Sequence, residues 1–522
     1  MILQIASTID NLLLSVPFIY NNVDVLPIAV PLLAGALMIL FRHRIKFQKY
    51  LNLAVSIIIL ILAFLLITKV IVNGPSAYAV GEFGKYGIVL VADLLSSSMV
   101  LLTAFISLMC VIYSYEYIES ESLNQSYYAL FNLMIAGLNG IFLTGDIFNL
   151  YVFFEIMFLA SIGLIFANEK LSSTLIEHKF EGAFKYLVLG MIGSTIMLIA
   201  IITTYGTIGS LNMADIALKI SILNQEGRLP WQIVAAGLLF IIVFGNKAAL
   251  FPLHYWLPDV HPTAPTPISA MLSGILIKVG VYGILRIVFL IYAPASSYYL
   301  PVLMLISLIT IVVGAIGAIA QTDLKRMLAY SSISQIGYVF LGLSIGTAGS
   351  IAAAFVYMIF HAVAKSMLFL TAGGVIHHAE TRDMTKMGGL IKTMPFYSAA
   401  FMIGAMSIAG IPPIAGFFSK MYLLKTGLEA GATIAVFIAL ITAFATIYYM
   451  FNSWISIFWG ESLKNKRFHS SHEMMLPIAI LCVFAILLGI LCNPVFEAGD
   501  IVASQIIDPE LYISTVLKVI PR

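Results

Sequence analysis

The sequence predicts an all-α, polytopic membrane protein with about fourteen transmembrane helices and two inverted five-helix repeats, each containing a broken helix. Three observations lead to this fold class. The chain of 522 residues is 61% hydrophobic and only 10% charged, whereas soluble domains are roughly 25% charged. Its apolar residues form runs of about the 20 residues that an α-helix needs to span a bilayer. Two of the longest runs are interrupted by proline.

The apolar runs define the predicted helices and domains. About fourteen runs can be placed, and they cover 25–41, 51–72, 88–114, 127–145, 147–167, 184–205, 231–257, 268–291, 299–320, 328–346, 349–376, 394–426, 431–459 and 474–492. The expected domains are N-terminal helices at 1–126, a first five-helix repeat at 127–291, a second at 299–459, and a C-terminal helix and tail at 460–522. The apolar N-terminus carries Asp10 but lacks the basic start of a cleaved signal peptide, so we expect a short interfacial helix there.

The basic residues predict the orientation in the membrane. If the N-terminus lies outside, fifteen Lys and Arg residues fall on the cytoplasmic side, namely Arg42, Arg44, Lys46, Lys49, Lys170, Lys179, Lys185, Lys325, Arg326, Arg382, Lys386, Lys392, Lys464, Lys466 and Arg467. The opposite side receives five, namely Lys85, Lys219, Arg228, Lys518 and Arg522. This excess follows the positive-inside tendency. We therefore expect a multi-pass membrane protein with both termini outside, and we place it in a prokaryotic cell membrane.

Several functional classes find no support in the sequence. The three cysteines, Cys110, Cys482 and Cys492, lie in or beside apolar runs without metal-ligand spacing, so we interpret them as buried thiols. No segment resembles a phosphate loop, a nucleophile with its base, or a cysteine framework for an iron–sulfur cluster. The net charge of +2 gives no indication of nucleic-acid binding. We expect no cofactor and no enzymatic activity of the chain itself.

Two polar segments are interpreted without a functional role. His254, Asp259 and His261 could suggest a metal site, but they lie in the proline-rich segment WLPDVHPTAPTP, which we place at a cytoplasmic exit with solvated side chains. No metal site is predicted there. The basic turn QTDLKRM at 321–327 is interpreted as a topology signal rather than as a gate.

Seven Lys and Arg residues remain within or at the ends of the apolar runs. Three fall in the outer turns, where a long side chain can reach the membrane surface, namely Lys69, Arg286 and Lys425. Four are flanked by apolar residues on both sides, namely Lys247, Lys278, Lys365 and Lys420. A charge at the bilayer centre costs about 2.5 to 3.5 kcal/mol on insertion scales, and such groups usually face a bundle interior or an ion path. These four lysines are therefore functional candidates.

One of these lysines lies in the first broken run. The segment 240–267 carries Lys247 and then Pro252, which removes a backbone donor and interrupts the helix. Such a break at membrane depth is tolerated where protein or a water-filled cavity surrounds it. Glu155 is the one carboxylate clearly inside an apolar run, and a buried carboxylate favours its charged form only when a cation lies nearby. Lys247 is its predicted partner.

The second broken run repeats this device. Residues 394–426 combine a long apolar run, an interruption at Gly410, Pro412, Pro413 and Gly416, and the single central lysine Lys420. The counterpart of the carboxylate helix is SSISQIGYVFLGLSIG, which offers Ser334 and Gln335 but no acid. The second unit instead brings His361 and Lys365, four residues apart on one helical face. Because histidine titrates near neutral pH, proton transfer is the favoured role of this pair.

The motifs together carry a family resemblance over about residues 90 to 460. It rests on FGNKAALFPLHYWLPDVHPTAPTPISAMLSGILIKVGVYGILR, QTDLKRMLAYSSISQIGY, FHAVAKSMLFL and AGIPPIAGFFSK. These segments resemble the antiporter-like subunits shared by respiratory complex I, membrane-bound hydrogenases and Mrp-type multisubunit Na+/H+ antiporters. TGDIFNLYVFFEIM looks more like the Mrp D subunits and their hydrogenase relatives than complex I. The tail DPELYISTVLK is also similar to Mrp D subunits.

The resemblance implies fourteen helices, two inverted units and a hydrophilic axis along the membrane plane. Its motifs place the ion-translocating positions at Glu155, Lys247, Lys278, His361, Lys365 and Lys420. The implied partners are other membrane subunits, H+, Na+ and the lipid bilayer. The HPTAPTP exit looks closer to the complex I and hydrogenase pattern than to many Mrp sequences, which leaves the parent complex open.

These observations lead to one principal hypothesis and two alternatives. The chain is expected to be a proton- or sodium-translocating subunit of a multisubunit cation/proton antiporter, in which Glu155 controls the protonation of Lys247 and the proton passes on through Lys278. The first alternative is a proton-pumping subunit of a redox complex, such as a membrane-bound hydrogenase or a complex I relative. The second is a non-conducting scaffold, for which neutral replacements of the buried lysines would leave ion movement unchanged.

Overall fold

The protein is a bundle of long helices with one small β-hairpin. The computed structural model describes residues 7, 10, 14, 16–81, 87–118, 126–166, 173–461 and 472–519, and only the backbone at 173–179. The helices and strands, in chain order, are α2 Pro17–Asn22, α3 Leu26–Leu40, α4 Ile45–Asn73, β1 Ser76–Val80, β2 Ile88–Ala92, α5 Leu94–Tyr117, α6 Tyr127–Leu143, α7 Ile147–Ile165, α8 Ser173–Ile208, α9 Met213–Gln225, α10 Trp231–Lys247, α11 Trp256–Thr263, α12 Thr266–Met271, the π-helix η2 Leu272–Leu276, α13 Ile277–Ile284, the π-helix η3 Leu285–Ile291, the 3-10 helix η4 Ala293–Ala295, α14 Ser296–Ile319, α15 Leu324–Ile345, α16 Ala348–Ala379, the 3-10 helix η5 Met384–Lys386, α17 Pro395–Ala409, α18 Ala415–Glu429, α19 Thr433–Phe458, α20 His472–Ile490, α21 Cys492–Ile507 and α22 Glu510–Val519.

The predicted polytopic helical fold is confirmed. Within the described ranges, ten helices are long and apolar enough to cross a membrane, and shorter apolar helices occur at Leu26–Leu40, Tyr127–Leu143, Trp231–Lys247 and Pro395–Ala409. Each apolar run of the sequence contains a helix or a broken pair of helices, but the first residues of the run 88–114 form strand β2. Most of the expected N-terminal interfacial helix lies outside the described residues. So do several cations used for the orientation, namely Lys85, Lys170, Lys464, Lys466, Arg467 and Arg522.

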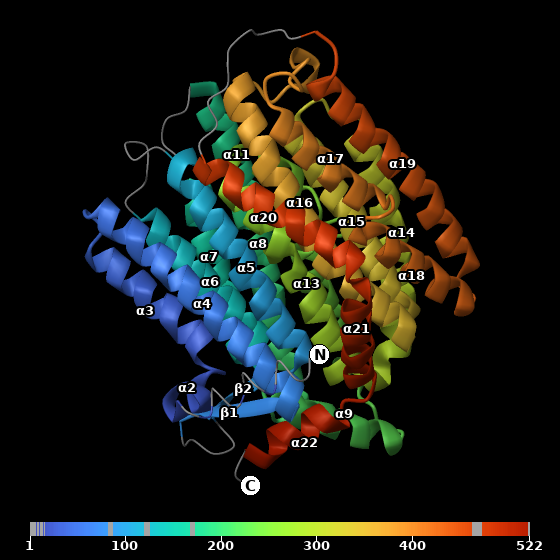
Figure 1. Ribbon diagram of the computed structural model, residues 1–522. Helices are drawn as coiled ribbons and strands as arrows, with labels where there is room; N and C mark the ends of the chain where they lie inside the picture. The colour runs from blue at the N-terminus through green and yellow to red at the C-terminus, as the bar shows by residue number, and fades with distance from the viewer. Residues whose placement is uncertain are drawn as a thin grey trace.

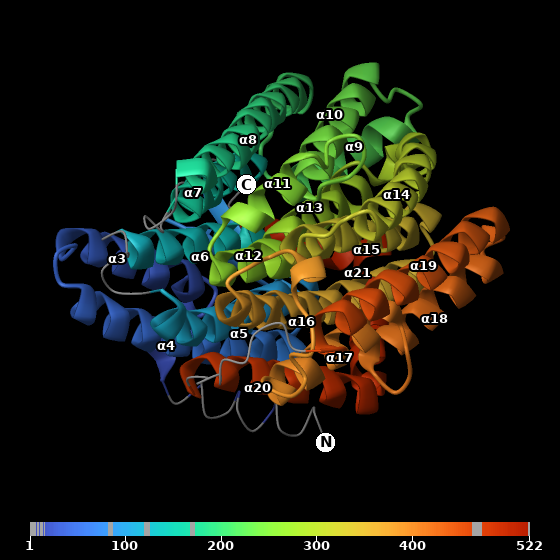
Figure 2. The ribbon, with the colours of Figure 1, turned by 90° about the horizontal axis from the view of Figure 1, so that it is seen from above.

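The helices that carry the candidate charges lie at the centre of the bundle. The most apolar window of Thr266–Ile291 is entirely buried, and the corresponding windows of α15 and α16 are 89% and 94% buried. The outer helices α14 and α19 are only 39% buried. Seen from above, α12, α13, α15 and α16 occupy the middle, with α3 and α4 on one side and α18 and α19 on the other (Figure 2). A charge on a central helix is thereby separated from the surrounding medium.

Both predicted helix breaks are present. Helix α10 ends at Lys247 and the chain becomes helical again at Trp256, so Pro252 lies in the intervening turns. In the second unit α17 ends at Ala409, and α18 begins at Ala415. The Phe251–Pro252 and Pro412–Pro413 peptide bonds are both cis. A third irregular helix runs from α12 to η3 and alternates α-helical and π-helical turns around Lys278. Such π-helical turns often occur at functional sites.

A β-hairpin that the sequence did not predict lies at one end of the bundle. Strands β1 and β2 pair antiparallel, with Ser76 opposite Ala92 and Val80 opposite Ile88. Figure 1 shows the hairpin beside α9 and the C-terminal helix α22, at the opposite end of the bundle from α11. Alternating side-chain burial is weak in this hairpin, since β2 is buried along most of its length. The period-two pattern that indicates a strand is therefore missing from its sequence.

Helices pack closely where small residues lie at their crossings. A Cβ atom on Gly314 of α14 would lie 2.4 Å from the backbone nitrogen of Ser334 in α15. No larger residue fits at that crossing without moving backbone. Small residues at helix interfaces permit this approach in membrane proteins. The buried-thiol interpretation holds for Cys110 and Cys482, whereas Cys492 is only partly buried.

Two of the three cations expected to extend to the membrane surface instead form ion pairs that are mostly buried. Lys425 is 69% exposed, as expected. Lys69 pairs with Asp24 at 2.6 Å. Arg286 pairs with Asp93 at 2.7 Å, and both side chains are at least nine-tenths buried. The expectation for Arg286 was wrong because Asp93, at the N-cap of α5, lies far away in sequence and is brought against η3 only by the fold.

We expect Arg286→Leu to lower the free energy of unfolding by about 3 to 5 kcal/mol, because it leaves the Asp93 carboxylate buried without its cation. Thermal unfolding of the purified protein in detergent measures this change. Arg228→Leu is the matched control, since its pair with Glu226 is 78% and 49% exposed and such pairs contribute about 0 to 1 kcal/mol. The double variant Asp93→Leu/Arg286→Leu should recover part of the loss. Equal effects of the two single arginine variants would contradict the role of the buried pair.

Candidate functional site

Lys247 ends the first half of the broken helix and is almost fully buried. It is the last residue of α10 and is 4% exposed. Its Nζ donates a hydrogen bond to Tyr186 Oη of α8 at 2.7 Å. Tyr186 Oη in turn lies 2.9 Å from Ser161 Oγ of α7. The amine is therefore the start of a short hydroxyl chain that runs across three helices.

Aromatic rings form the remaining surroundings of the Lys247 amine. Its Nζ lies 5.4 Å from the ring centroid of Phe154, 5.5 Å from that of Phe158 and 5.0 Å from that of Tyr186. Phe154 and Phe158 are four residues apart on α7, so they occupy one face of that helix. Ring faces attract a cation through their quadrupole. A pocket beside the amine is lined by these rings together with Asn246 and others.

Glu155 faces a different neighbour from the one expected. It is partly exposed, and its Oε1 accepts a hydrogen bond from Ser194 Oγ of α8. No direct ion pair joins Glu155 to Lys247 in the structure, so the predicted salt bridge is absent. The reason is helical geometry, because the ring of Phe154 occupies the side of α7 that faces Lys247 and Glu155 is rotated about 100° further round the helix. Glu155 and Lys247 nevertheless contact the same helix, α8, through Ser194 and Tyr186.

The start of α7 holds a second acid outside the span. Asp146 is the N-cap residue, and its Oδ1 accepts the backbone N–H of Asn149 at 2.7 Å. Burial raises the pKa of the Asp146 carboxyl to about 6, although hydrogen bonds from the backbone favour its charged form. Its position fixes where α7 begins and hence the depth of Glu155.

The centre of the molecule brings the two units into contact. Lys278 is fully buried, and its Nζ donates to Ser273 O at 2.5 Å. The same Nζ lies 2.8 Å from Nδ1 of His361 on α16. Ser273 Oγ also lies 2.8 Å from Ser332 Oγ of α15. Two of the predicted residues, from separate units of the sequence, therefore meet within hydrogen-bonding distance.

The second unit continues the series of buried cations. Lys365, one turn after His361 on α16, donates from Nζ to Leu328 O at 3.0 Å. Lys420, near the start of α18, donates to Ile408 O of α17 at 2.8 Å. Its Nζ lies 4.9 Å from the ring centroid of Tyr338. Both amines are held by carbonyls at helix positions where the usual backbone partner is missing or shared.

The counterpart of Glu155 also receives a hydroxyl from the following helix. Gln335 accepts a hydrogen bond from Tyr357 of α16 through Oε1. Its amide group lies 3.5 Å from Tyr449 Oη of α19, which donates to Ser331 at 3.0 Å. Glu155 with Ser194 and Gln335 with Tyr357 are thus alike in arrangement and different in charge.

None of the four buried lysines forms a direct ion pair with a carboxylate in the described parts of the chain, although Glu155 acts electrostatically on Lys247. The ion pairs found there involve other cations, and the lysine amines bind hydroxyls, carbonyls or an imidazole instead. Buried charges without a counterion are costly and usually mark function in membrane proteins. This arrangement can accept and release protons along hydrogen-bonded groups.

Sequence reasoning missed the hydroxyl partners. Tyr186, Ser161, Ser194, Ser273 and Ser332 contact the candidate residues or their immediate partners. Serine and tyrosine are frequent within these apolar runs, and their ordinary role there is helix packing. Only the fold separates the few that face a charge from the many that do not.

We expected the polar side chains that follow the first broken helix to be solvated, and for the two histidines this was wrong. His254 and His261 are 2% and 0% exposed. The ring of His261 stacks on Phe369 of α16 with centroids 4.4 Å apart. Helix α11 packs against α8 and α15, which the sequence could not show. No group of three or more potential metal ligands occurs among the described residues.

Comparison with known proteins identifies the family of the chain. The family described as NADH:quinone oxidoreductase/Mrp antiporter, transmembrane, matches residues 144–446. The chain is 36% identical to the D subunit of the Na(+)/H(+) antiporter of Alkalihalophilus pseudofirmus over 501 residues, covering 95% of this chain and all of the relative. It is also 36% identical to the N subunit of the NADH-quinone oxidoreductase of Desulforudis audaxviator over 438 residues, 82% of this chain and 85% of the relative.

Two solved structures have a similar fold. A chain of the Mrp complex from Dietzia sp. superposes with a TM-score of 0.87 at 27% identity, covering 95% of this chain and 99% of that one. A chain of an archaeal membrane-bound sulfane sulfur reductase gives the same TM-score and identity and is covered completely. With the family match extending over most of the membrane helices and over the candidate lysines, the chain belongs to the NADH:quinone oxidoreductase/Mrp antiporter family of membrane subunits.

Proposed function

We propose that this chain is an ion-translocating subunit of a multisubunit Na+/H+ antiporter of the Mrp type and that it is not itself an enzyme. The observation that carries the proposal is the series of buried lysines, joined at the centre by the 2.8 Å contact between Lys278 and His361. Two relatives named as the D subunit of a Na(+)/H(+) antiporter match over the whole of their length. Its partners are other membrane subunits of the same complex, and the transported ions are H+ and Na+.

The proposed path runs along the membrane plane through both units. Glu155 sets the charge around α8, Lys247 loads a proton next to Tyr186, and Lys278 passes it to His361. Lys365 and Lys420 continue the path to an exit. Each step moves a proton between groups that bind a hydroxyl, a carbonyl or an imidazole, and water completes the gaps between them. Ion movement is driven by a gradient across the membrane.

We also propose the membrane arrangement. The two broken helices belong to inverted five-helix repeats at 127–291 and 299–459, preceded by N-terminal helices at 1–126 and followed by the C-terminal segment 460–522. The protein is a multi-pass component of the prokaryotic cell membrane, and both termini lie outside. The two units repeat the same order of helices, and this supports the repeat assignment. A helix with a central polar residue (α7 or α15) is followed by a long helix (α8 or α16) and then by a broken helix (α10–α11 or α17–α18).

A second candidate function has specific support. The 36% identity to an NADH-quinone oxidoreductase subunit and the likeness to a sulfane sulfur reductase chain favour a proton-pumping subunit of a redox complex. Purification of the intact complex, identification of its partners and reconstitution in vesicles separate the two. Sodium-dependent proton movement without an electron donor supports the antiporter. Proton movement that requires an electron donor overturns it in favour of the redox pump.

Within the reconstituted complex, we expect Glu155→Gln to lower the Na+-dependent proton flux by about tenfold or more, since the variant keeps the shape of the side chain and removes its charge. Fluorescence of a pH-sensitive dye in proteoliposomes measures this flux. Glu429→Gln is the matched control, because that carboxylate is 62% exposed at the end of α18. Wild-type flux from a fully assembled Glu155→Gln complex would contradict the proposed role.

A further inference from the structure

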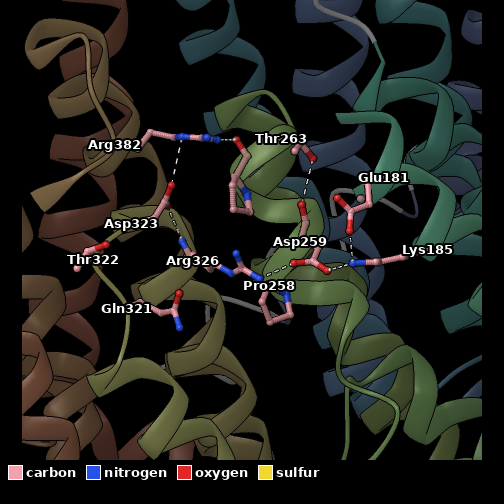
Figure 3. A pocket seen from close by; sticks show the side chains of 12 residues that line it. Glu181, Lys185, Pro258, Asp259, Thr263, Gln321, Thr322, Asp323, Arg326 and Arg382 are labelled. Carbon is pink, nitrogen blue, oxygen red and sulfur yellow. Dashed lines mark hydrogen bonds and ion pairs between the residues drawn. The ribbon is translucent and has the colours of Figure 1, made fainter. Parts of the chain in front are cut away.

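A charged cluster lies where the exit of the first broken helix meets the second unit. The charged residues that line the pocket there are Glu181, Lys185, Asp259, Asp323, Arg326 and Arg382. These residues come from α8, from α11, from the α14–α15 turn, from the start of α15 and from the segment after α16. Figure 3 shows Asp259 between Lys185 on one side and Arg326 on the other. The cluster therefore bridges segments on both sides of the predicted repeat boundary.

Asp259 forms the central contact of this cluster. Its Oδ2 pairs with Lys185 Nζ of α8 at 2.7 Å, and its Oδ1 pairs with Arg326 Nη2 of α15 at 2.7 Å. The two carboxylate oxygens thus hold cations on two different helices. Asp259 is 19% exposed, while its partners are 42% and 44% exposed. The carboxylate is the least exposed member of the three.

Two further cations of this region bind backbone carbonyls at the end of α11. Lys325 Nζ donates to Ala264 O at 2.9 Å, and Arg382 donates to Pro262 O. Arg382 also pairs with Asp323 at 3.2 Å, and Asp323 caps α15 by accepting the Arg326 N–H. Carbonyls at the end of a helix lack intrahelical partners, so cations are favoured there. The short helix α11 is therefore bound to the start of α15 through the side chain of Asp259 and through the main-chain carbonyl of Ala264.

These contacts between α11 and α15 lie next to two candidate ion sites, Lys247 and Lys365. Lys185 is followed by Tyr186, whose hydroxyl binds the Lys247 amine at 2.7 Å. Arg326 lies in the first turn of α15, and the carbonyl of Leu328, two residues later, accepts the Lys365 amine at 3.0 Å. Hydrogen bonds, ion pairs and neighbouring residues of α8 and α15 therefore connect Lys247 to Lys365 through Asp259. Coupling between distant sites is carried by such contiguous contacts when the elements have two positions.

We propose that Asp259 is a positioning residue that couples the protonation of Lys247 in the first unit to the site of Lys365 in the second. The inference rests on the proposed ion-translocating function. A change of charge at Lys247 alters its bond to Tyr186, and the adjoining Lys185 passes the displacement of α8 to Asp259. Arg326 then moves the first turn of α15 and, with it, the carbonyl that holds Lys365. Asp259 itself carries no proton along the path.

The first arm of the test measures transport in the reconstituted intact complex. Asp259→Asn should lower the maximal Na+-dependent proton flux by about tenfold and leave the KM for Na+ unchanged. Arg326→Gln should have the same effect, and the double variant should be no worse than either single one, because both remove the same linkage. Asp259→Glu should restore most of the flux. Glu181→Gln is the matched control, since Glu181 pairs with the same Lys185 at 2.7 Å but is not the carboxylate that holds α15.

The second arm measures the coupling without relying on transport. Amide hydrogen exchange at 324–332 is compared in the purified complex with and without Lys247→Gln. That substitution should change the exchange rate by about fivefold when Asp259 is present and leave it unchanged in Asp259→Asn. Wild-type flux in Asp259→Asn, additive losses in the double variant, or exchange that responds to Lys247→Gln in both backgrounds would overturn the inference. Coupled exchange in a complex without Na+-dependent flux would uphold the linkage and overturn the proposed function.

Discussion

Replacing Lys247 by alanine is expected to reduce Na+-dependent proton flux by about a hundredfold or more, the loss typical of removing a positioned acid–base group. The amine is the only cation seen beside the rings of Phe154, Phe158 and Tyr186 among the described residues. Alanine leaves Tyr186 bonded to Ser161 but removes the group that exchanges a proton with it. Flux in proteoliposomes containing the whole complex, normalised to the amount of assembled protein, measures the effect.

Lys247→Arg separates two explanations of that loss. Arginine keeps a positive charge and does not release its proton in proteins. If Lys247 carries protons, Lys247→Arg should be almost as inactive as Lys247→Ala. If the lysine supplies only a fixed positive charge, the arginine variant should retain its activity. Lys425→Ala controls for loss of a lysine as such, because that side chain is 69% exposed. Full activity of an assembled Lys247→Ala complex would establish the non-conducting scaffold instead.

The helices could be predicted from the sequence because a bilayer permits few solutions. Backbone groups in lipid must be satisfied within the protein, so long apolar runs become helices and breaks occur only in enclosed places. The interruptions at Pro252 and at Pro412 therefore identified real ends of helices. The hairpin β1–β2 could not be predicted in the same way, because its second strand is too evenly buried to show alternation.

The buried lysines could be predicted for a related reason, whereas their partners could not. A lysine in an apolar run is conspicuous because its burial is costly. The hydroxyl of Tyr186 and the carboxylate of Asp93 look ordinary in the sequence, and their roles depend on which helix lies opposite. A direct contact between Glu155 and Lys247 is absent for the same reason, since rotation about α7 turns Phe154 toward the lysine and Glu155 toward Ser194. The two charges still interact electrostatically.

Asp259 shows most clearly which contacts cannot be predicted from the sequence. In the sequence it lies in a proline-rich exit, next to residues that are commonly solvated, and nothing there indicates a partner for it. In the fold it joins Lys185 and Arg326, which are far apart along the chain. Ion pairs between separate helices leave no periodic pattern in the sequence, so neither hydropathy nor spacing reveals them. The charge balance of the pocket appears only after the helices are packed.

Gly416→Ala is expected to disrupt the second broken helix and to abolish Na+-dependent flux. A Cβ atom at this position would lie 1.7 Å from Ser407 O, which is backbone of α17 and has no freedom to rotate away. Helix α18 must then move relative to α17, and Lys420 loses the Ile408 carbonyl that its Nζ now reaches at 2.8 Å. Forced overpacking of this kind costs about 3 kcal/mol. The thermal unfolding midpoint of the purified complex and its flux in proteoliposomes measure the two consequences.

The matched control for this substitution is Gly206→Ala in α8, where a Cβ atom meets no heavy atom within 4 Å. Alanine is favoured over glycine within a helix by roughly 1 kcal/mol, so this variant should be at least as stable as the parent and fully active. A Gly416→Ala complex that unfolds at the parental temperature and transports at the parental rate would contradict the close approach of α17 and α18. Loss of flux with unchanged stability would instead show that only the position of Lys420 is changed. In that case α17 and α18 would have moved apart without lowering the stability of the bundle.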